Sequence, residues 1–300
     1  MLLRTRDQEL DLTHRAAIVG IVNATPDSFS DGDPRGVERA AERARELADQ
    51  GADLIEVGGE SNVSNRPAVD ATEEIERVSP AVSAAAETGL PVVIDTYKPA
   101  VAAAALDAGA SIVNDISGFA DPEMAPLCAR EGAGVVLMHT ETPPKQVRWD
   151  EDLYPEGVEP QMMEFFELGL ERLAEAGVER DRVALDPGPD FAKTPHQTVE
   201  ALRALPAIGE LGRPVYLAVS RKDFIGALTG KRPKERGAGT FAAIAVALES
   251  CGRLLRVHDV AATRDFLTVW EALRGDRDVP TDLRIDESVR RDQAPSGEGS

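Results

Sequence analysis

Polar side chains that could bind a ligand follow the first apolar, β-branched run of this chain. They lie in the stretch Asn23–Asp31, which comes directly after the run Ala17–Val22. Pro26 removes a backbone donor and disfavours the α conformation at Thr25, so the stretch is expected to be a loop. Its polar groups could bind a ligand, or they could cap the turn that carries them.

Carboxylates and an amide end three of the later apolar runs. Asp95, Asn114 and Asp186 are hydrogen-bond acceptors that could converge on one ligand. Such a set suits a flat, nitrogen-rich heterocycle, because carboxylates read paired amino and ring N–H donors. A structural hydrogen bond is the alternative for each, and for Asp186, which precedes Pro187 and Gly188, that alternative is a turn cap.

Cationic and polar side chains gather at the last two runs. Lys222 follows the seventh run, and Arg256 and His258 end the eighth. Together with Asn23 they suit an anion such as phosphate. Charged groups at a buried mouth are costly unless they bind a ligand or one another, so a network of ion pairs without a catalytic role is the alternative. The run ends together predict a small polar heterocycle that carries phosphate.

These side chains need a framework that brings the ends of distant runs together. Eight apolar runs alternate with eight helical patterns, and glycine follows many of the helical patterns, as expected of a helix cap. This order predicts parallel βαβ units, and the count favours a closed (β/α)8 TIM barrel with its ligand site at the C-terminal face of the strands. The expected strands are Ala17–Val22, Leu54–Val57, Val92–Asp95, Ser111–Asn114, Gly134–Met138, Val183–Asp186, Val215–Val219 and Leu254–Val257. The expected helices are Val37–Gln50, Glu73–Ala86, Pro99–Ala108, Pro122–Arg130, Met162–Ala176, Thr198–Leu205, Lys234–Glu249 and Ala261–Leu273.

The barrel is expected to occupy residues 1–274, with Arg4–Thr13 as a lead-in strand or arm. Residues 275–300 are charged, rich in Pro, Gly and Ser, and poor in apolar residues, which is typical of a flexible C-terminal tail. Two long loops, Gly58–Thr72 and His139–Gln161, follow the second and fifth strands. Long loops at the carboxyl face of a barrel usually bind or cover a ligand.

The composition limits the partners of the chain. A net charge of -20 over 300 residues argues against nucleic acid or an anionic membrane surface, although local cations can still hold an anionic substrate. No apolar run approaches a membrane span, and the N-terminus lacks the apolar core of a signal peptide. The two cysteines, Cys128 and Cys251, fit buried free thiols, so a cytoplasmic location is expected. The sequence also lacks zinc-ligand spacing, a glycine-rich phosphate loop and a hydrolase nucleophile elbow.

Taken in order, the motifs at the run ends resemble those of the dihydropteroate synthases, pterin-binding (β/α)8 enzymes of folate biosynthesis. The similarity extends from about Ala17 to Leu273, and its motifs occur in the family's order. The matching motifs are Asn23–Gly32, Glu56–Ser61, Ile94–Thr96, Val113–Ile116, Val136–His139, Leu185–Gly188, Ser220–Lys222 and Arg256–Asp259.

The resemblance implies roles for the matched residues. Asp95, Asn114 and Asp186 would bind the pterin ring, Met138 would line its pocket, and Lys222 would hydrogen-bond it. On the diphosphate side, the resemblance implies that Mg2+ is held by Asn23 and the oxygens by Arg256 and His258. Phe191 and Ser220 would help bind the second substrate, p-aminobenzoate, and the second loop with Ser61, Asn62 and Arg66 would help build its site. The catalytic Asp27 and the substrate-binding Phe29 would belong to a mobile first loop that closes late.

The implied reaction is a displacement at the pterin C9 methylene by the aniline nitrogen of p-aminobenzoate, with pyrophosphate leaving. In this family it looks dissociative, so it needs stabilisation of the leaving group and exclusion of water more than a strong base. The family commonly forms homodimers through its late helices, and a homodimer is expected here.

Two segments depart from the family pattern, both on the p-aminobenzoate side. The usual Thr-Arg-Pro-Gly after Glu60-Ser61 is replaced by Asn62–Ala68, and Asp190 and Ala192 stand where the family has glycines. The rebuilt loop predicts altered p-aminobenzoate recognition and lower sensitivity to sulfonamides. Arg66 could take over the role of the displaced loop arginine or be a solvated loop charge.

Two other functions are alternatives to the synthase: a pterin-binding paralogue without synthase activity, and a pterin-dependent methyltransferase domain. The cation cluster argues against the methyltransferase.

Overall fold

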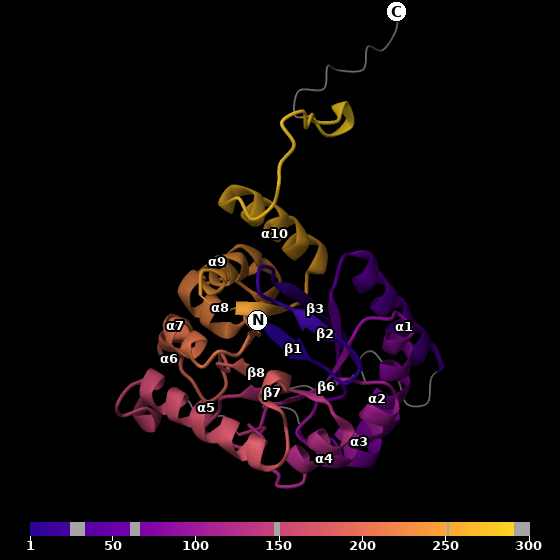
Figure 1. The fold of residues 1–300 in the computed structure, drawn as a ribbon, viewed down its shortest axis with the longest axis vertical. Coiled ribbons are helices and arrows are strands. Elements are labelled where there is room, and N and C mark those ends of the chain that lie inside the picture. Colours follow the sequence, from indigo (N-terminus) through magenta and orange to yellow (C-terminus); the bar gives the residue numbers. More distant parts are fainter. Residues whose placement is uncertain (25–33, 61–66, 147–150, 251, 291–300) are drawn as a thin grey trace, which may run out of the picture. The chain divides into compact units, whose positions relative to one another are not determined.

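Eight parallel strands form a closed barrel in this protein, in the order β10-β3-β4-β5-β6-β7-β8-β9. The computed structural model describes residues 1–24, 34–60, 67–146, 151–250 and 252–290. The predicted (β/α)8 TIM barrel is confirmed, and helices surround the strands (Figure 1). The barrel strands are β3 (Ala17–Asn23), β4 (Leu54–Gly58), β5 (Val92–Asp95), β6 (Ile112–Asp115), β7 (Gly134–Met138), β8 (Val183–Asp186), β9 (Val215–Leu217) and β10 (Gly252–Val257).

The helices agree with the sequence pattern to within four residues at each end except after β8 and β9. After β8, two helices, α6 and α7, stand where the single helix Thr198–Leu205 was expected. Helix α8 was not expected because it has only seven residues with a glycine inside, too few for a clear helical period. Helix α9 begins at Gly237 rather than Lys234, because Pro233–Glu235 forms a separate 3-10 turn. The helices are α1 (Pro34–Asp49), α2 (Ala71–Ala86), α3 (Pro99–Asp107), α4 (Met124–Glu131), α5 (Val158–Glu175), α6 (Pro195–Arg203), α7 (Leu205–Glu210), α8 (Asp223–Thr229), α9 (Gly237–Leu248) and α10 (Val260–Arg274).

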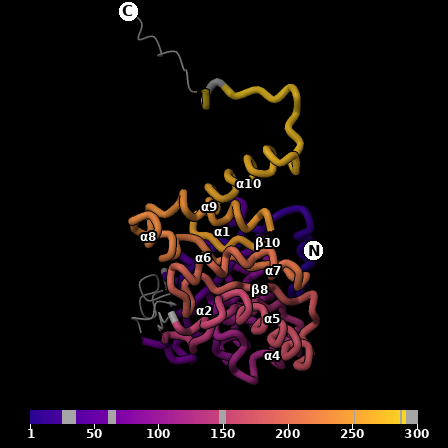
Figure 2. Tube along the Cα trace, turned by 90° about the vertical axis from the view of Figure 1, so that its left-hand side faces the viewer, coloured from indigo at the N-terminus to yellow at the C-terminus, as the bar shows by residue number. Residues whose placement is uncertain are grey.

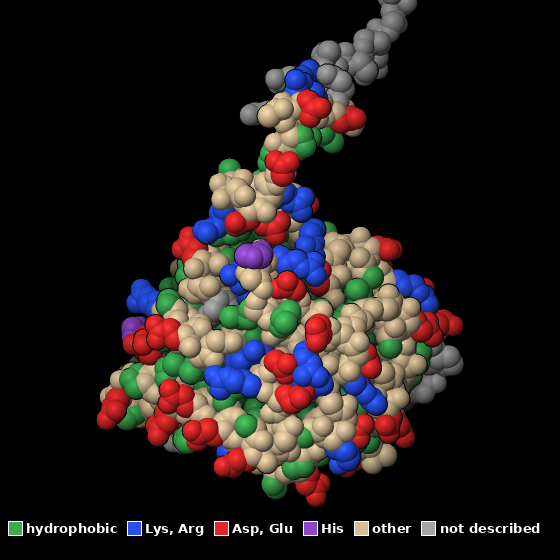
Figure 3. All heavy atoms as spheres, viewed as in Figure 1, with side chains coloured by type: hydrophobic (Ala, Val, Ile, Leu, Met, Phe, Trp, Pro, Cys, Tyr) green, Lys and Arg blue, Asp and Glu red, His purple; other side chains and the backbone are tan. Residues whose placement is uncertain are grey.

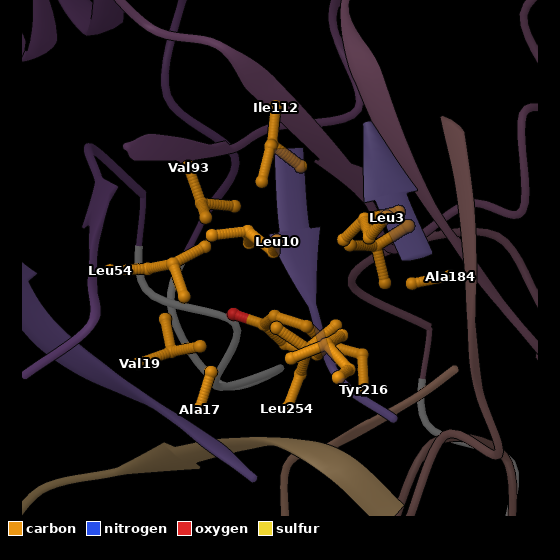
Figure 4. Packing of buried hydrophobic residues seen from close by; sticks show 12 residues of the cluster. Leu3, Leu10, Ala17, Val19, Leu54, Val93, Ile112, Ala184, Tyr216 and Leu254 are labelled. Carbon is orange, nitrogen blue, oxygen red and sulfur yellow. The ribbon is translucent and has the colours of Figure 1, made fainter. Parts of the chain in front are cut away.

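An antiparallel hairpin closes the N-terminal end of the barrel. Its strands, β1 (Leu2–Arg4) and β2 (Glu9–Asp11), lie at the barrel end marked by the N-terminus in Figures 1 and 2. Leu3, Leu10 and Leu12 belong to one buried cluster with side chains of the barrel strands, and Figure 4 shows Leu3 and Leu10 among them. The expected lead-in strand is therefore a plug. The strand residues of this cluster are Ala17, Val19, Leu54, Val93, Ile112, Val136, Ala184, Tyr216 and Leu254.

Arginine side chains connect the hairpin to the barrel through hydrogen bonds to backbone carbonyls. The buried Arg213 donates from Nε to the carbonyl of Val183 at 2.9 Å, and from its Nη2 to the carbonyls of Leu2 at 2.9 Å and Asp181 at 3.0 Å. Arg182 donates to the carbonyl of Thr5 at 2.7 Å. Basic and acidic side chains are interspersed on this face of the molecule (Figure 3). The arginines therefore satisfy backbone carbonyls that would otherwise be left at the base of the barrel.

Two compact units make up the chain, Met1–Arg264 and Asp265–Ser300. Helix α10 begins in the first unit and continues in the second, where the rings of Phe266 and Trp270 stack at 5.9 Å. The predicted boundary at residue 274 and the flexibility of the tail remain predictions. Within the described ranges, no helix is both long and apolar enough to cross a membrane.

Candidate active site

The pairing register of the strands brings the predicted side chains to one rim. Asn23 is opposite Gly58, Gly58 is opposite Asp95, and Asp95 is opposite Asn114. These four residues therefore lie at the same level at the carboxyl ends of β3 to β6. On the other side of the mouth, the paired strand ends are Met138 and Asp186.

A buried carboxylate, Glu56, joins side chains from three other strands beneath this rim. Its Oε1 accepts from Arg256 Nε at 2.5 Å, and its Oε2 accepts from the Tyr216 hydroxyl at 2.5 Å and from Asn114 Nδ2 at 3.2 Å. Arg256 Nη2 lies 3.7 Å from Asp95 Oδ2. Glu56 is only 1% exposed, so its charge is balanced by Arg256 and two hydrogen-bond donors rather than by water.

This network fixes the charge of its members. Burial disfavours the Arg256 cation, but the charges of Glu56 and Asp95 prevail and raise its pKa above the ordinary value. Burial and the neighbouring Glu56 charge raise the pKa of Tyr216 well above its usual range. Arg256 is thus a permanent cation, and Tyr216 stays protonated and can donate to Glu56.

One acceptor of this network is open. Asn114 Nδ2 is occupied by Glu56, whereas Asn114 Oδ1 has no hydrogen-bond partner anywhere in the described part of the chain. The side chain is 4% exposed, and a buried acceptor without a partner costs about 1–3 kcal/mol. A ligand that brings an N–H donor to Asn114 would remove this cost.

Asp186 combines a structural bond with a buried position at the mouth. Its Oδ1 accepts from the Gly188 N–H at 2.8 Å, so the turn cap expected as an alternative is present. Gly188 has a φ of +61°, and a Cβ there would lie 2.1 Å from the carbonyl oxygen of His139, so only glycine fits this bend. Burial raises the pKa of Asp186 to about 6, against the opposing effects of the Gly188 N–H and Lys222. The side chain is therefore largely, though not completely, ionised at pH 7.

Cationic and polar side chains follow β9 and β10, the two strands that come after β8 around the barrel. The Lys222 ammonium is 4.3 Å from the centre of the Phe191 ring, a cation–π contact. His258 Nδ1 lies 3.0 Å from Ser220 Oγ, and burial together with the charge of Arg256 lowers its pKa to about 4. His258 is therefore neutral at pH 7, and Ser220 orients its ring. Arg43 of α1, which the sequence pattern did not indicate, donates to the carbonyl of His258 at 3.4 Å.

The structure brings together part of the predicted site and adds to it. Glu56 and Tyr216 had no assigned role, although a carboxylate between Ile55 and Val57 in a buried strand is itself a signal of a specific partner. The predicted site residues that lie outside the described ranges are Asp27, Phe29, Ser61, Asn62 and Arg66.

Asn23 is the residue at this rim predicted to hold magnesium. Among the described residues, no cluster of three or more His, Cys, Asp or Glu side chains could hold a metal. The exposed amide of Asn23 at the end of β3 offers an oxygen ligand. Mg2+ is often bound by one or two protein groups together with phosphate oxygens and water, so Asn23 fits an ion that arrives with a diphosphate.

Comparisons with known proteins agree with this geometry. A family model described as pterin binding enzyme matches residues 19–258. The dihydropteroate synthase of Bacillus subtilis is 38% identical over 275 residues, which cover 91% of this chain and 93% of that protein.

Solved structures are similar over nearly the whole chain. The dihydropteroate synthase of Xanthomonas albilineans with 4-aminobenzoic acid has a TM-score of 0.82 and 40% identity, and covers 93% of this chain and 99% of that chain. The enzyme from the same organism in complex with 7,8-dihydropteroate has a TM-score of 0.80 and 40% identity, with 93% and 100% coverage.

Proposed function

This chain belongs to the dihydropteroate synthases, a family of pterin-binding transferases, and we propose that it condenses 6-hydroxymethyl-7,8-dihydropterin diphosphate with p-aminobenzoate. The products are 7,8-dihydropteroate and pyrophosphate. The observation that carries the proposal is the mouth itself, where an open buried amide oxygen and carboxylates lie beside a cluster of cations. That division matches a substrate with a donor-rich ring and an anionic leaving group.

The acceptor side would hold the pterin. Asp95, Asn114 and Asp186 come from neighbouring or nearby strands and are all buried. Carboxylates and an amide oxygen can accept from the amino and ring N–H groups of a pterin. Glu56 would contribute indirectly, because it holds the Asn114 amide and leaves Oδ1 as the free acceptor. Met138, buried beside Asp186, would contact the flat face of the ring.

The cationic side would hold the diphosphate. Arg256 keeps its charge at every working pH, and the neutral His258 can donate from one ring nitrogen. Asn23 would hold Mg2+ on the diphosphate, and the ion would supply positive charge to the leaving oxygen. Charges fixed in place before the reaction stabilise the departing group without reorganisation.

The second substrate would approach from the side of Lys222. The relatives solved with 4-aminobenzoic acid and with 7,8-dihydropteroate support such a site. Phe191 would offer an aromatic face, and Ser220 a hydroxyl. As the C9–O bond breaks and electrons pass to the diphosphate oxygen, the aniline nitrogen forms the new bond to C9 and then loses a proton to solvent.

The rebuilt second loop supports a finer proposal about inhibitors. Asn62–Ala68 replaces the family's usual Thr-Arg-Pro-Gly on the p-aminobenzoate side. Sulfonamides imitate p-aminobenzoate, so we infer that the altered loop weakens their binding. Inhibition by sulfamethoxazole as strong as that of an enzyme with the usual loop would overturn this inference.

A homodimer and a cytoplasmic location are part of the proposal. Helix α9 carries exposed apolar residues such as Ala242 and Val246 on its outer face, which suits a contact between late helices. Sedimentation of the purified chain tests the dimer, since a monomer at micromolar concentration would exclude it. The buried free thiol of Cys128 is consistent with a reducing compartment.

A turnover assay tests the proposed reaction directly. The purified chain is incubated with the pterin diphosphate, p-aminobenzoate and Mg2+, and pyrophosphate and dihydropteroate are measured together. We expect both products in equal amounts and neither when p-aminobenzoate is omitted. Binding of the pterin diphosphate without product would instead identify a pterin-binding paralogue.

A further inference from the structure

The segment between β8 and α6 contains two residues in a backbone conformation that favours glycine. Asp190 has a φ of +65° and Ala192 a φ of +48°. Both stand where the family usually has glycine. A side chain at such a position is disfavoured, so contacts around it must hold the backbone in place.

Asp190 makes these contacts with a different loop of the barrel. Its Oδ2 accepts from the backbone N–H of Asp223 at 2.5 Å, and its Oδ1 accepts from that of Phe224 at 3.2 Å. These residues form the first turn of α8, directly after Lys222, whose own side chain makes no capping hydrogen bond. On its own side, Asp190 donates from its N–H to Thr198 Oγ1 at 3.1 Å, and the Thr198 hydroxyl donates to Asp190 Oδ1 at 3.3 Å. One carboxylate thus joins the loops that follow β8 and β9.

The other flank of the segment is held by Lys193. Its buried Nζ donates to the carbonyls of His139, Gly188 and Phe191, each at 3.2 Å. Phe191 therefore lies between two fixed points, and its ring meets the Lys222 ammonium at 4.3 Å.

We propose that Asp190 is a positioning residue of the transferase reaction: its carboxylate fixes the first turn of α8 and so holds the Lys222 ammonium against the Phe191 ring. Glycine at this position would leave the same backbone path but no acceptor for the two N–H groups. The side chain therefore adds a direct connection between the Phe191 segment and the lysine that faces it. The kinetic consequence rests on the proposed function, whereas the connection itself does not.

The charge of Asp190 also acts on Lys222. Burial lowers the pKa of Lys222, and Asp190 is the strongest of the groups that oppose this effect. Replacing the carboxylate should lower the pKa of Lys222 further, which a purely structural role of the side chain would not do. The other charged or titratable groups that face Lys222 are Asp95, Asp186, Lys193, Arg256 and His258.

Three variants of the full chain test the proposal. Asp190→Asn removes the charge but keeps one acceptor and tolerates a positive φ, and Asp190→Gly restores the family residue without any acceptor. Thr198→Ala is the matched control, since it removes a partner of Asp190 but leaves both bonds to α8. We expect kcat to fall about 10-fold or more in both Asp190 variants, because small errors in position are costly to catalysis. Thr198→Ala removes two loop hydrogen bonds but neither bond to α8, and kcat should stay within about 2-fold of the parent.

The second readout is the pKa of the Lys222 ammonium, measured by nitrogen-15 NMR; the Lys222→Arg variant assigns the signal. We expect this pKa to fall in Asp190→Asn and to be unchanged in Thr198→Ala. An unchanged titration in Asp190→Asn, or an equal loss of kcat in Thr198→Ala, would overturn the proposal. If the parent chain made no dihydropteroate, the proposed function would fail, yet the titration would still decide the role of Asp190.

Discussion

The two ends of the barrel both bury charged side chains, but they use them differently. At the N-terminal end, Arg213 gives its hydrogen bonds to backbone carbonyls of the hairpin and its surroundings. At the C-terminal end, Arg256 is bound to the Glu56 carboxylate and lies near Asp95. The first arginine completes the backbone hydrogen bonding of the fold, and the second belongs to a side-chain network that faces the open mouth.

The difference shows that a buried charge alone does not identify a functional site. Both arginines are largely buried, and both replace water with specific partners. Within the described residues, each end also has a buried acceptor without a partner, and the two differ in kind. At the N-terminal end it is Asp181 Oδ1, whose carboxylate is already paired with Arg4 through its other oxygen. At the C-terminal end it is the neutral amide oxygen Asn114 Oδ1, beside the Glu56–Arg256 network at the open mouth, where a ligand with an N–H donor can satisfy it.

Replacing each arginine with alanine should give the largest difference between the two ends, with a loss of catalysis at one and a loss of stability at the other. Arg256→Ala should lower kcat/KM for the pterin diphosphate by about 1,000-fold, because a fixed cation at the leaving group is lost. It should also weaken pyrophosphate binding more than pterin binding. Arg213→Ala should lower the free energy of unfolding by about 2–4 kcal/mol through its unpaired carbonyls, with kcat per folded molecule within about 2-fold. Steady-state kinetics and urea titrations measure both quantities.

The opposite pattern would remove the distinction between the ends. If Arg213→Ala lost more turnover than folded protein, the N-terminal end of the barrel would contribute to catalysis. Equal losses of pterin and pyrophosphate affinity in Arg256→Ala would argue against its role at the anion.

A leucine of the hairpin tests the structural end by itself. Leu10→Ala should destabilise the chain by about 2–5 kcal/mol, because it leaves a cavity where the plug meets the strands. Leu2→Ala is the matched control in the same hairpin, since Leu2 is 47% exposed. Urea unfolding should show the difference, and kcat of the folded fraction should be unchanged in both variants. A similar stability for Leu10→Ala and Leu2→Ala would mean that the hairpin is not a plug.

The pH dependence of ligand binding separates two buried aspartates. Burial raises the pKa of both Asp115 and Asp186 to about 6, but Asp115 accepts from Ser117 whereas Asp186 lies at the mouth. An ionised Asp186 is the better acceptor for the N–H groups of the pterin ring. The affinity for the pterin ligand should therefore be highest above pH 7 and fall by up to about 10-fold per pH unit below pH 6. The dihydropterin alcohol is the suitable ligand because it carries no titrating diphosphate. Asp115→Asn should keep this profile, and a profile that disappeared in Asp115→Asn would contradict the assignment.

Several features of the fold were accessible from the sequence because they repeat or are local. The β-branched runs and helical patterns gave the barrel, and the motifs at their ends placed Asp95, Asn114 and Asp186 at one rim. The hairpin was only partly predictable, because three-residue strands carry little periodicity. Helix α8 was missed for the same reason of length.

The contacts across the barrel could not be read from the sequence. Tyr216 reaches Glu56 over 160 residues, and nothing local marks a tyrosine in a core strand as a donor to a distant carboxylate. The same holds for Asp190, whose departure from glycine was visible but whose bonds to α8 depend on the packing of two loops. Such long-range pairs follow from barrel closure rather than from any pattern of neighbours.

Calorimetric titration with the pterin diphosphate in the presence of Mg2+ tests the central claim most directly, namely that the C-terminal mouth binds the pterin. The parent chain and Asp115→Asn should bind it alike. Asp186→Ala should lose at least about 100-fold in affinity, because a charged acceptor of the ring is removed. Equal affinity in Asp186→Ala and the parent would contradict the assignment of the pterin to this rim.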